Sequence, residues 1–179
     1  DATNGEMITG QRCAELDIVY RELLHAGSVT LLDIVKKENI ELACDKLILF
    51  ARWITPNFFS RRFDAFFFVA QTPFDHIASH DNVESVNSFW TTPSHALKEA
   101  DEGRVTIVFA TRMNLQKLTK QRTVSSLVET AKKEDVVTVE PDFHEKNGSV
   151  TYTIPVEAGY GLTQFIEYGG PSLKIRSQT

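Results

Sequence analysis

The sequence predicts an α/β protein, and three patterns along the chain carry that prediction. Apolar residues recur at helical spacing through residues 9–46. Two segments rich in strand-forming residues follow at 47–55 and 62–71, and the unbroken apolar run at 66–69 is typical of a strand buried on both faces. Alternating strand-like segments return around the Asn-Gly pair at 147–148. We therefore expect an α/β/α sandwich with a central mixed sheet, an appended helical region over about 9–46 and a C-terminal β-hairpin.

The helical region divides at residues that favour helix ends. A helix that starts near Thr9 is expected to end at Gly27, because glycine readily takes the left-handed conformation found after a helix. Thr30 is a typical N-cap for a second helix, which Asn39 ends, and a third short helix is expected over 41–46.

The rest of the chain alternates strands and helices. The strands at 47–55 and 62–71 are expected to pair antiparallel through a turn with Pro56 and Asn57, and a short strand is expected over 83–90. Helices are expected over 94–102, between an N-cap at Thr92 and a stop at Gly103, and over 112–119 and 123–133. The Asn-Gly pair predicts a two-residue hairpin turn between strands at 136–139 and 150–154.

Length and composition bound the classes of function. The 179 residues suit one domain, 1–179, in which 9–46, 47–134 and 135–160 form the helical, core and hairpin regions. The net charge of −5 and the lack of a basic cluster argue against a nucleic-acid partner. The two cysteines form no CxxC pair, and no apolar run is long enough to cross a membrane. We expect a cytoplasmic protein with no membrane partner.

Candidate site residues lie beside the phenylalanine-rich strand. Arg61 and Arg62 are adjacent guanidinium groups, which can bind phosphate oxygens in a bidentate manner. The alternative is a surface ion pair with Asp64, which can compensate only one of them. Neighbouring strand residues point to opposite faces, so only one arginine would face a ligand. Glu84 is a second candidate, with an ordinary surface carboxylate as its alternative.

Four blocks of sequence together resemble the Nudix hydrolases, in particular the branch of peroxisomal coenzyme A diphosphatases and their bacterial relatives. The blocks are FARWITP (50–56), RRFDAFFFVA (61–70), SHDNVES (79–85) and FWTTPSHAL (89–97). The resemblance implies a Nudix-like sandwich and metal-dependent cleavage of a phosphoanhydride in a coenzyme A derivative or a related nucleoside diphosphate. It implies Mg²⁺ or Mn²⁺ as cofactor. It also places Arg61, Arg62 and Trp90 on the substrate side and gives Glu84 a catalytic or metal-binding role.

The sequence departs from that family at its defining element, the Nudix box of metal-binding glutamates. The segment around Arg21 and Glu22 mimics the second half of the box, but His25 and Ala26 stand where glutamates are needed. In the family the box precedes the helical insertion, so we expect this chain to be the C-terminal part of a longer Nudix protein and to be inactive alone. The alternative is a catalytically silent Nudix-like binding or interaction module. The sequence does not decide whether the protein forms a homodimer.

Overall fold

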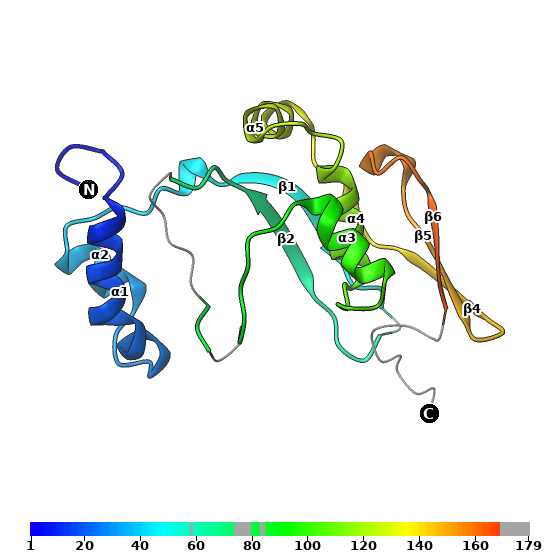
Figure 1. Ribbon diagram of the computed structural model, residues 1–179, viewed down its shortest axis with the longest axis horizontal. Coiled ribbons are helices and arrows are strands. Elements are labelled where there is room, and N and C mark those ends of the chain that lie inside the picture. Colours follow the sequence, from blue (N-terminus) through cyan, green and yellow to red (C-terminus); the bar gives the residue numbers. More distant parts are fainter. Residues whose placement is uncertain (58, 74–79, 83–84, 169–179) are drawn as a thin grey trace. The chain divides into compact units, whose positions relative to one another are not determined.

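The computed structural model describes residues 1–57, 59–73, 80–82 and 85–168. The chain divides into two compact units, a helical unit of Asp1–Leu47 with Gln71–Phe89 and a sheet unit of Ile48–Ala70 with Trp90–Thr179. Within the described residues, five α-helices and two three-stranded sheets form a mixed α/β protein (Figure 1), which confirms the predicted class. None of the helices in this part of the chain has the length and apolar character needed to span a membrane.

The helical unit follows its predicted boundaries closely. Helix α1 (Gly10–His25) starts at Thr9, whose side chain accepts a hydrogen bond from the Arg12 backbone. Helix α2 (Leu31–Lys37) starts at Thr30, which forms a reciprocal capping box with Asp33. Gly27 and Asn39 have positive φ angles of 67° and 51°, as expected of helix ends. The third helix, expected over 41–46, is only the 3-10 turn η1 (Cys44–Lys46).

The first sheet contains β1 (Ile48–Ile54), β2 (Asp64–Val69) and β3 (Thr138–Val139) in the order β2-β1-β3. The first two strands pair antiparallel, as predicted, and β1 pairs in parallel with β3, so the sheet is mixed. The register shifts between Leu49 and Ala51, which leaves both Phe50 and Ala51 buried in the core. This bulge lets one short strand supply two consecutive core residues.

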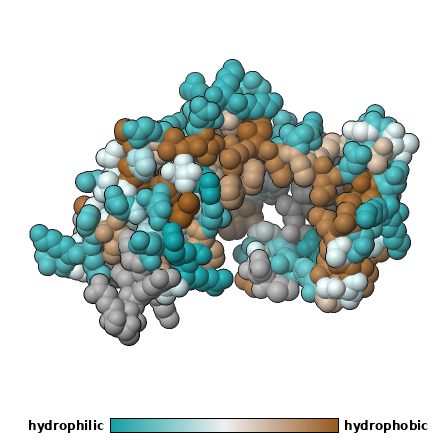
Figure 2. Space-filling view, turned by 180° about the vertical axis from the view of Figure 1, so that it is seen from behind, coloured by the Kyte–Doolittle hydropathy of each residue, from teal (hydrophilic) through white to brown (hydrophobic). Residues whose placement is uncertain are grey.

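The prediction that residues 66–69 are buried on both faces is wrong. Phe67 packs against the core, whereas Phe66 and Phe68 are 50% and 52% exposed. The strand that carries them, β2, is an edge strand in the described sheet, and no described layer covers its outward side chains. Large apolar side chains are visible at the surface in Figure 2. An apolar run alone does not distinguish a strand with one open face from a doubly covered strand.

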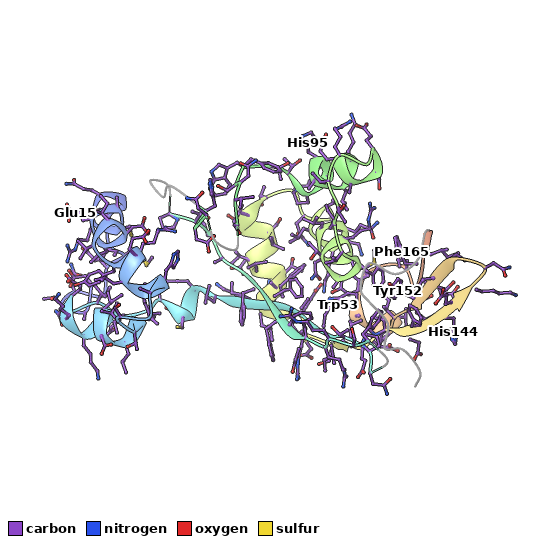
Figure 3. The ribbon with its side chains drawn as sticks, turned by 90° about the horizontal axis from the view of Figure 1, so that it is seen from below. Glu15, Trp53, His95, His144, Tyr152 and Phe165 are labelled. Carbon is purple, nitrogen blue, oxygen red and sulfur yellow. The ribbon has the colours of Figure 1, made fainter. Side chains whose placement is uncertain are left out.

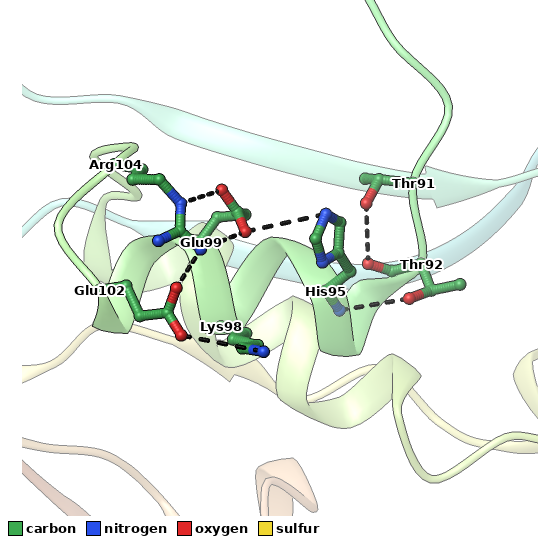
Figure 4. A network of polar contacts seen from close by, with 7 residues as sticks. All are labelled: Thr91, Thr92, His95, Lys98, Glu99, Glu102 and Arg104. Atoms are coloured by element: carbon green, nitrogen blue, oxygen red, sulfur yellow. Dashed lines mark hydrogen bonds and ion pairs between the residues drawn. The ribbon is translucent and has the colours of Figure 1, made fainter.

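Three helices of the sheet unit confirm their predictions: α3 (Pro93–Asp101), α4 (Phe109–Leu118) and α5 (Val124–Lys133). Thr92 caps α3 by accepting from the His95 backbone at 3.2 Å, and Arg104 forms ion pairs with Glu99 and Glu102 near the end of the helix (Figure 4). These groups are solvent-exposed, so we treat the network as a surface brace for α3.

The strand predicted over 83–90 does not form in its described part, 85–90, and residues 83 and 84 lie outside the described residues. A hydrogen bond between a side chain and the backbone occurs at the start of this segment. The Asp81 side chain accepts from the Ser85 backbone at 2.8 Å, and Asn82 adopts a φ of 61°. Asp and Asn side chains compete with strand pairing in this way.

The second sheet contains the predicted hairpin, but with a different first strand. Strands β4 (Asp142–Lys146), β5 (Ser149–Thr153) and β6 (Gln164–Tyr168) pair antiparallel in that order. Asn147 and Gly148 form the predicted turn, with φ angles of 52° and 74°. The first hairpin strand is β4 and not the segment 136–139, because a two-residue turn pairs the residues directly beside it, here Lys146 with Ser149. Part of 136–139 forms β3 instead.

Candidate functional site

A cavity of about 300 Å³ lies within the sheet unit. The first sheet, the start of α4, β5 and the loops after β1 and β3 supply its walls. Its lining is largely apolar and includes six aromatic side chains, Trp53, Phe59, Phe63, Phe67, Phe109 and Tyr152. Cavities of this size and lining bind small molecules through apolar surface with a few polar anchors.

Phe109, the first residue of α4, joins the walls of the cavity. Its ring meets Trp53 edge-on at 5.5 Å and stacks on Tyr152 at 4.4 Å and on Phe165 at 5.1 Å. Figure 3 shows Trp53, Tyr152 and Phe165 in one region of the sheet unit, although they come from three different strands. Aromatic pairs of this geometry hold one another in place beyond their burial.

The start of α4 forms one wall of the cavity. The residues from Phe109 to Thr111 line it, and the N-cap residue Val108 makes no side-chain hydrogen bond to the first turn. The first turn contains no acidic residue either. The backbone N–H groups at a helix start and the positive end of the helix dipole favour an anion.

The structure separates the two predicted arginines. Arg62 donates from Nε to the Thr55 carbonyl oxygen at 2.7 Å and pairs with Glu140 at 3.0 Å. Arg61 lies 4.9 Å over the ring of Phe63, which lines the cavity, and no ion pair of Arg61 occurs among the described residues. Both precede β2 in irregular backbone. Arg62 is therefore held by the protein, whereas Arg61 has no ion pair within the described part of the chain and contacts Phe63 of the cavity wall.

The alternative in which Asp64 compensates one of these arginines is wrong. Asp64 accepts two hydrogen bonds from Arg52 across the sheet, at 2.9 and 2.7 Å. The Arg52 hydrogen bond holds the pKa of the Asp64 carboxyl below its usual range. Arg52 and Ile54 point to the same face of β1 as Asp64 does on β2, and this cross-strand placement was not foreseen from sequence spacing.

Of the other two predicted site residues, the structure describes only Trp90. Trp90 is 75% exposed and is not among the described residues that line the cavity. Glu84 lies outside the described residues. Among the predicted site residues that the structure describes, Arg61 and Arg62 each contact a lining residue of the cavity, Phe63 and Thr55 respectively. No single motif singled out Phe109 or Tyr152, which lie far from the arginines in sequence.

The described residues do not fit a shared divalent ion. No group of three His, Cys, Asp or Glu side chains within 1–57, 59–73, 80–82 and 85–168 could hold a metal. Carboxylate oxygens from several residues are needed to hold Mg²⁺ or Mn²⁺ at a phosphate. No chemical step is therefore assigned to a metal on these residues.

Comparison with known proteins adds no family to these observations. No protein-family model matches the chain, and no curated protein or solved structure matches it either.

Proposed function

We propose that the sheet unit binds a coenzyme A derivative or a related nucleoside diphosphate, as the substrate side of a Nudix-like sandwich that cleaves a phosphoanhydride. The observation that carries the proposal is the aromatic cavity with Arg61, unpaired among the described residues, on its lining residue Phe63. A ligand of this class combines a flat aromatic base with a diphosphate, and the cavity and the arginine offer one partner for each. The resemblance of residues 50–56 and 61–70 to Nudix hydrolases supports the same assignment.

The apolar part of the ligand has a suitable partner in the cavity. Six aromatic rings line a volume of about 300 Å³, and the polar lining groups are few. Burial of a planar ring against such walls is favourable by roughly 25 cal/mol for each Å² of apolar surface, and aromatic stacking adds to it.

The charged part of the ligand has two favourable neighbours. Arg61 offers up to five N–H donors in a planar fork, and its stacking on Phe63 keeps the guanidinium near the lining. The uncapped first turn of α4 lines the same cavity and favours negative charge. Arg62 is less suited to the ligand, because Thr55 and Glu140 already hold its guanidinium.

The second candidate function is a catalytically silent binding module of the same fold. One observation favours it: the described residues contain no group that could hold a divalent ion. Assay of coenzyme A hydrolysis by this chain with Mg²⁺ and with Mn²⁺ separates the two. We expect no metal-stimulated turnover, and robust turnover would require metal ligands that lie outside the described residues.

Isothermal titration of the 179-residue chain with coenzyme A tests the binding proposal. Loss of one charge-assisted contact costs about 1.5–3 kcal/mol, so Arg61→Ala should weaken binding roughly tenfold to a hundredfold. Arg62→Ala is the matched control, and it should act mainly on stability. If coenzyme A does not bind, or if both variants bind as the wild type does, the proposal is wrong.

A further inference from the structure

Two buried hydrogen bonds in series begin at a residue of the cavity wall. The Trp53 indole N–H donates to the Tyr160 hydroxyl at 2.8 Å, and this hydroxyl donates to Asn114 Oδ1 at 2.8 Å. All three residues are buried. Trp53 lines the cavity, whereas Tyr160 is not among the described lining residues. Tyr160 therefore reaches the cavity only through Trp53.

Tyr160 lies in a turn between two glycines with positive φ angles. The flanking residues Gly159 and Gly161 have φ angles of 75° and 80°, which side-chain-bearing residues rarely adopt. Lys120 of the segment after α4 donates to the Gly159 carbonyl oxygen at 2.9 Å, and a Cβ atom on Gly161 would lie 3.2 Å from the Lys120 amine. Lys120 thus holds the turn before the tyrosine, and the positive φ angles favour glycine on both sides of it.

The hydroxyl keeps both of its hydrogen bonds at ordinary pH. Burial raises the pKa of Tyr160 to about 12, and the hydrogen bond from Trp53 opposes this rise only in part. A neutral hydroxyl accepts from the indole and donates to the amide at the same time. Its removal would leave the Trp53 N–H and Asn114 Oδ1 buried without that partner.

We infer that Tyr160 is a positioning residue of the cavity: its hydroxyl fixes the orientation of the Trp53 indole and thereby the shape of the wall that takes the aromatic part of the ligand. The identity of that ligand rests on the proposed function, whereas the orientation of the indole is independent of it. With its N–H engaged by Tyr160, the indole meets Phe109 edge-on at 5.5 Å and Tyr160 itself at 5.4 Å. The Trp53 indole therefore presents an apolar surface to the cavity.

Two measurements on Tyr160→Phe test the inference. The first is hydrogen exchange of the Trp53 indole N–H in nitrogen-15-labelled protein, with a Trp90→Phe sample used only to assign the two indole signals. The second is the affinity for coenzyme A by calorimetry. Loss of a buried hydrogen bond of ordinary strength should speed the exchange roughly tenfold and weaken binding by a similar factor.

Tyr20→Phe is the matched control, because it removes a buried tyrosine hydroxyl's hydrogen bond to Glu38 in the helical unit. It should change neither quantity. Unchanged indole exchange in folded Tyr160→Phe would overturn the inference, as would faster exchange with undiminished coenzyme A affinity. Faster exchange in a chain whose wild type binds no coenzyme A would support the fixed indole and reject the proposed function. If Tyr160→Phe does not fold, Asn114→Ala removes the acceptor that orients the hydroxyl; it should speed the indole exchange and weaken binding by less than tenfold, and unchanged exchange in the folded variant would overturn the inference.

Discussion

The two units of the chain differ most in how they bury apolar side chains. In the described part of the helical unit, only Tyr20 and Ile34 are buried hydrophobic residues, and several leucines of α1 and α2 are exposed. The sheet unit instead has a continuous core drawn from β1, β3, α4, α5 and the region after β5. This core contains Phe50, Ala51, Trp53, Met113, Ala131, Val139, Ile154, Ala158 and Tyr160. Both units have helix caps and surface ion pairs, and the larger buried core belongs to the sheet unit.

This difference bears on where a ligand can be held. A binding site needs side chains that are already fixed by packing before the ligand arrives. The cavity of the sheet unit meets that need for most of its aromatic lining, because each of these side chains except Phe63 belongs to or packs against a buried cluster. The helical unit also has an open groove beside Tyr20 and Ile34, but the side chains around it are mostly not buried. We therefore place the candidate site in the sheet unit.

The largest effect is expected from the two methionines, which lie one in each unit. Met113 is fully buried and Met7 is 56% exposed. Met113→Ala should lower the free energy of unfolding of the sheet unit by about 2–5 kcal/mol, whereas Met7→Ala should change stability little. Denaturation followed by tryptophan fluorescence reports on the sheet unit, because Trp53 and Trp90 both belong to it, and hydrogen exchange of the α1 and α2 amides reports on the helical unit. Equal effects of the two variants would remove the contrast between the units.

A smaller effect is expected at the turn of the second sheet. Gly148 has a φ of 74°, and no atom lies within 4 Å of the place where a Cβ would be. Gly148→Ala should therefore destabilise the sheet unit by backbone strain alone, by about 1–2 kcal/mol. Gly148→Asn is the control, because asparagine tolerates this conformation better and should recover part of the loss. If alanine were as stable as glycine here, the turn would not be set by local conformation.

The smallest effect concerns the helical unit and depends on pH. The Tyr20 hydroxyl, and more weakly Arg12, donate to Glu38 and hold the pKa of its carboxyl below the usual range. A carboxyl whose pKa is lowered on folding stabilises the fold above its unfolded pKa, about 4.3 for glutamate, and loses that contribution as the pH falls through the folded value. The backbone amides of α1 and α2 should therefore lose protection from hydrogen exchange as the pH falls below the unfolded pKa of Glu38.

Glu38→Gln tests this sign directly. The variant should be less stable near neutral pH and should lose the acid-dependent opening attributed to Glu38. The capping carboxyl of Asp33, whose pKa is lowered by Thr30, titrates in the same direction and remains in the variant. An unchanged pH profile in Glu38→Gln would contradict the assignment.

Local sequence signals predicted the ends of helices and the hairpin turn better than they predicted which strand faces are covered. Thr9, Thr30 and Thr92 marked helix starts correctly, because a cap is made by residues next to one another in sequence. The Asn147 and Gly148 turn was likewise foreseen, whereas its first strand was misplaced. The open face of Phe66 and Phe68 depends on what lies against the strand, which no local pattern encodes.

The candidate site shows the same limit. The site role of the arginine pair stays a prediction from its chemistry. Glu140 was not predicted as the partner of Arg62, because 78 residues separate the two. Tyr160 and Trp53 are separated by 107 residues, and only the packing of the sheet unit brings them into hydrogen-bond contact. Glycines on both sides of Tyr160 were the one local sign of a specialised turn.

Mapping of coenzyme A onto the amide spectrum of the 179-residue chain tests the central claim most directly, namely that the sheet unit holds the ligand site. We predict that the shifted amides cluster in the loop from Thr55 to Phe63 and in the first turn of α4, while those of α1 and α2 stay in place. The same titration on Arg61→Ala should shift the same amides at higher ligand concentration. Shifts confined to α1 and α2, or no shifts at all, would contradict the account.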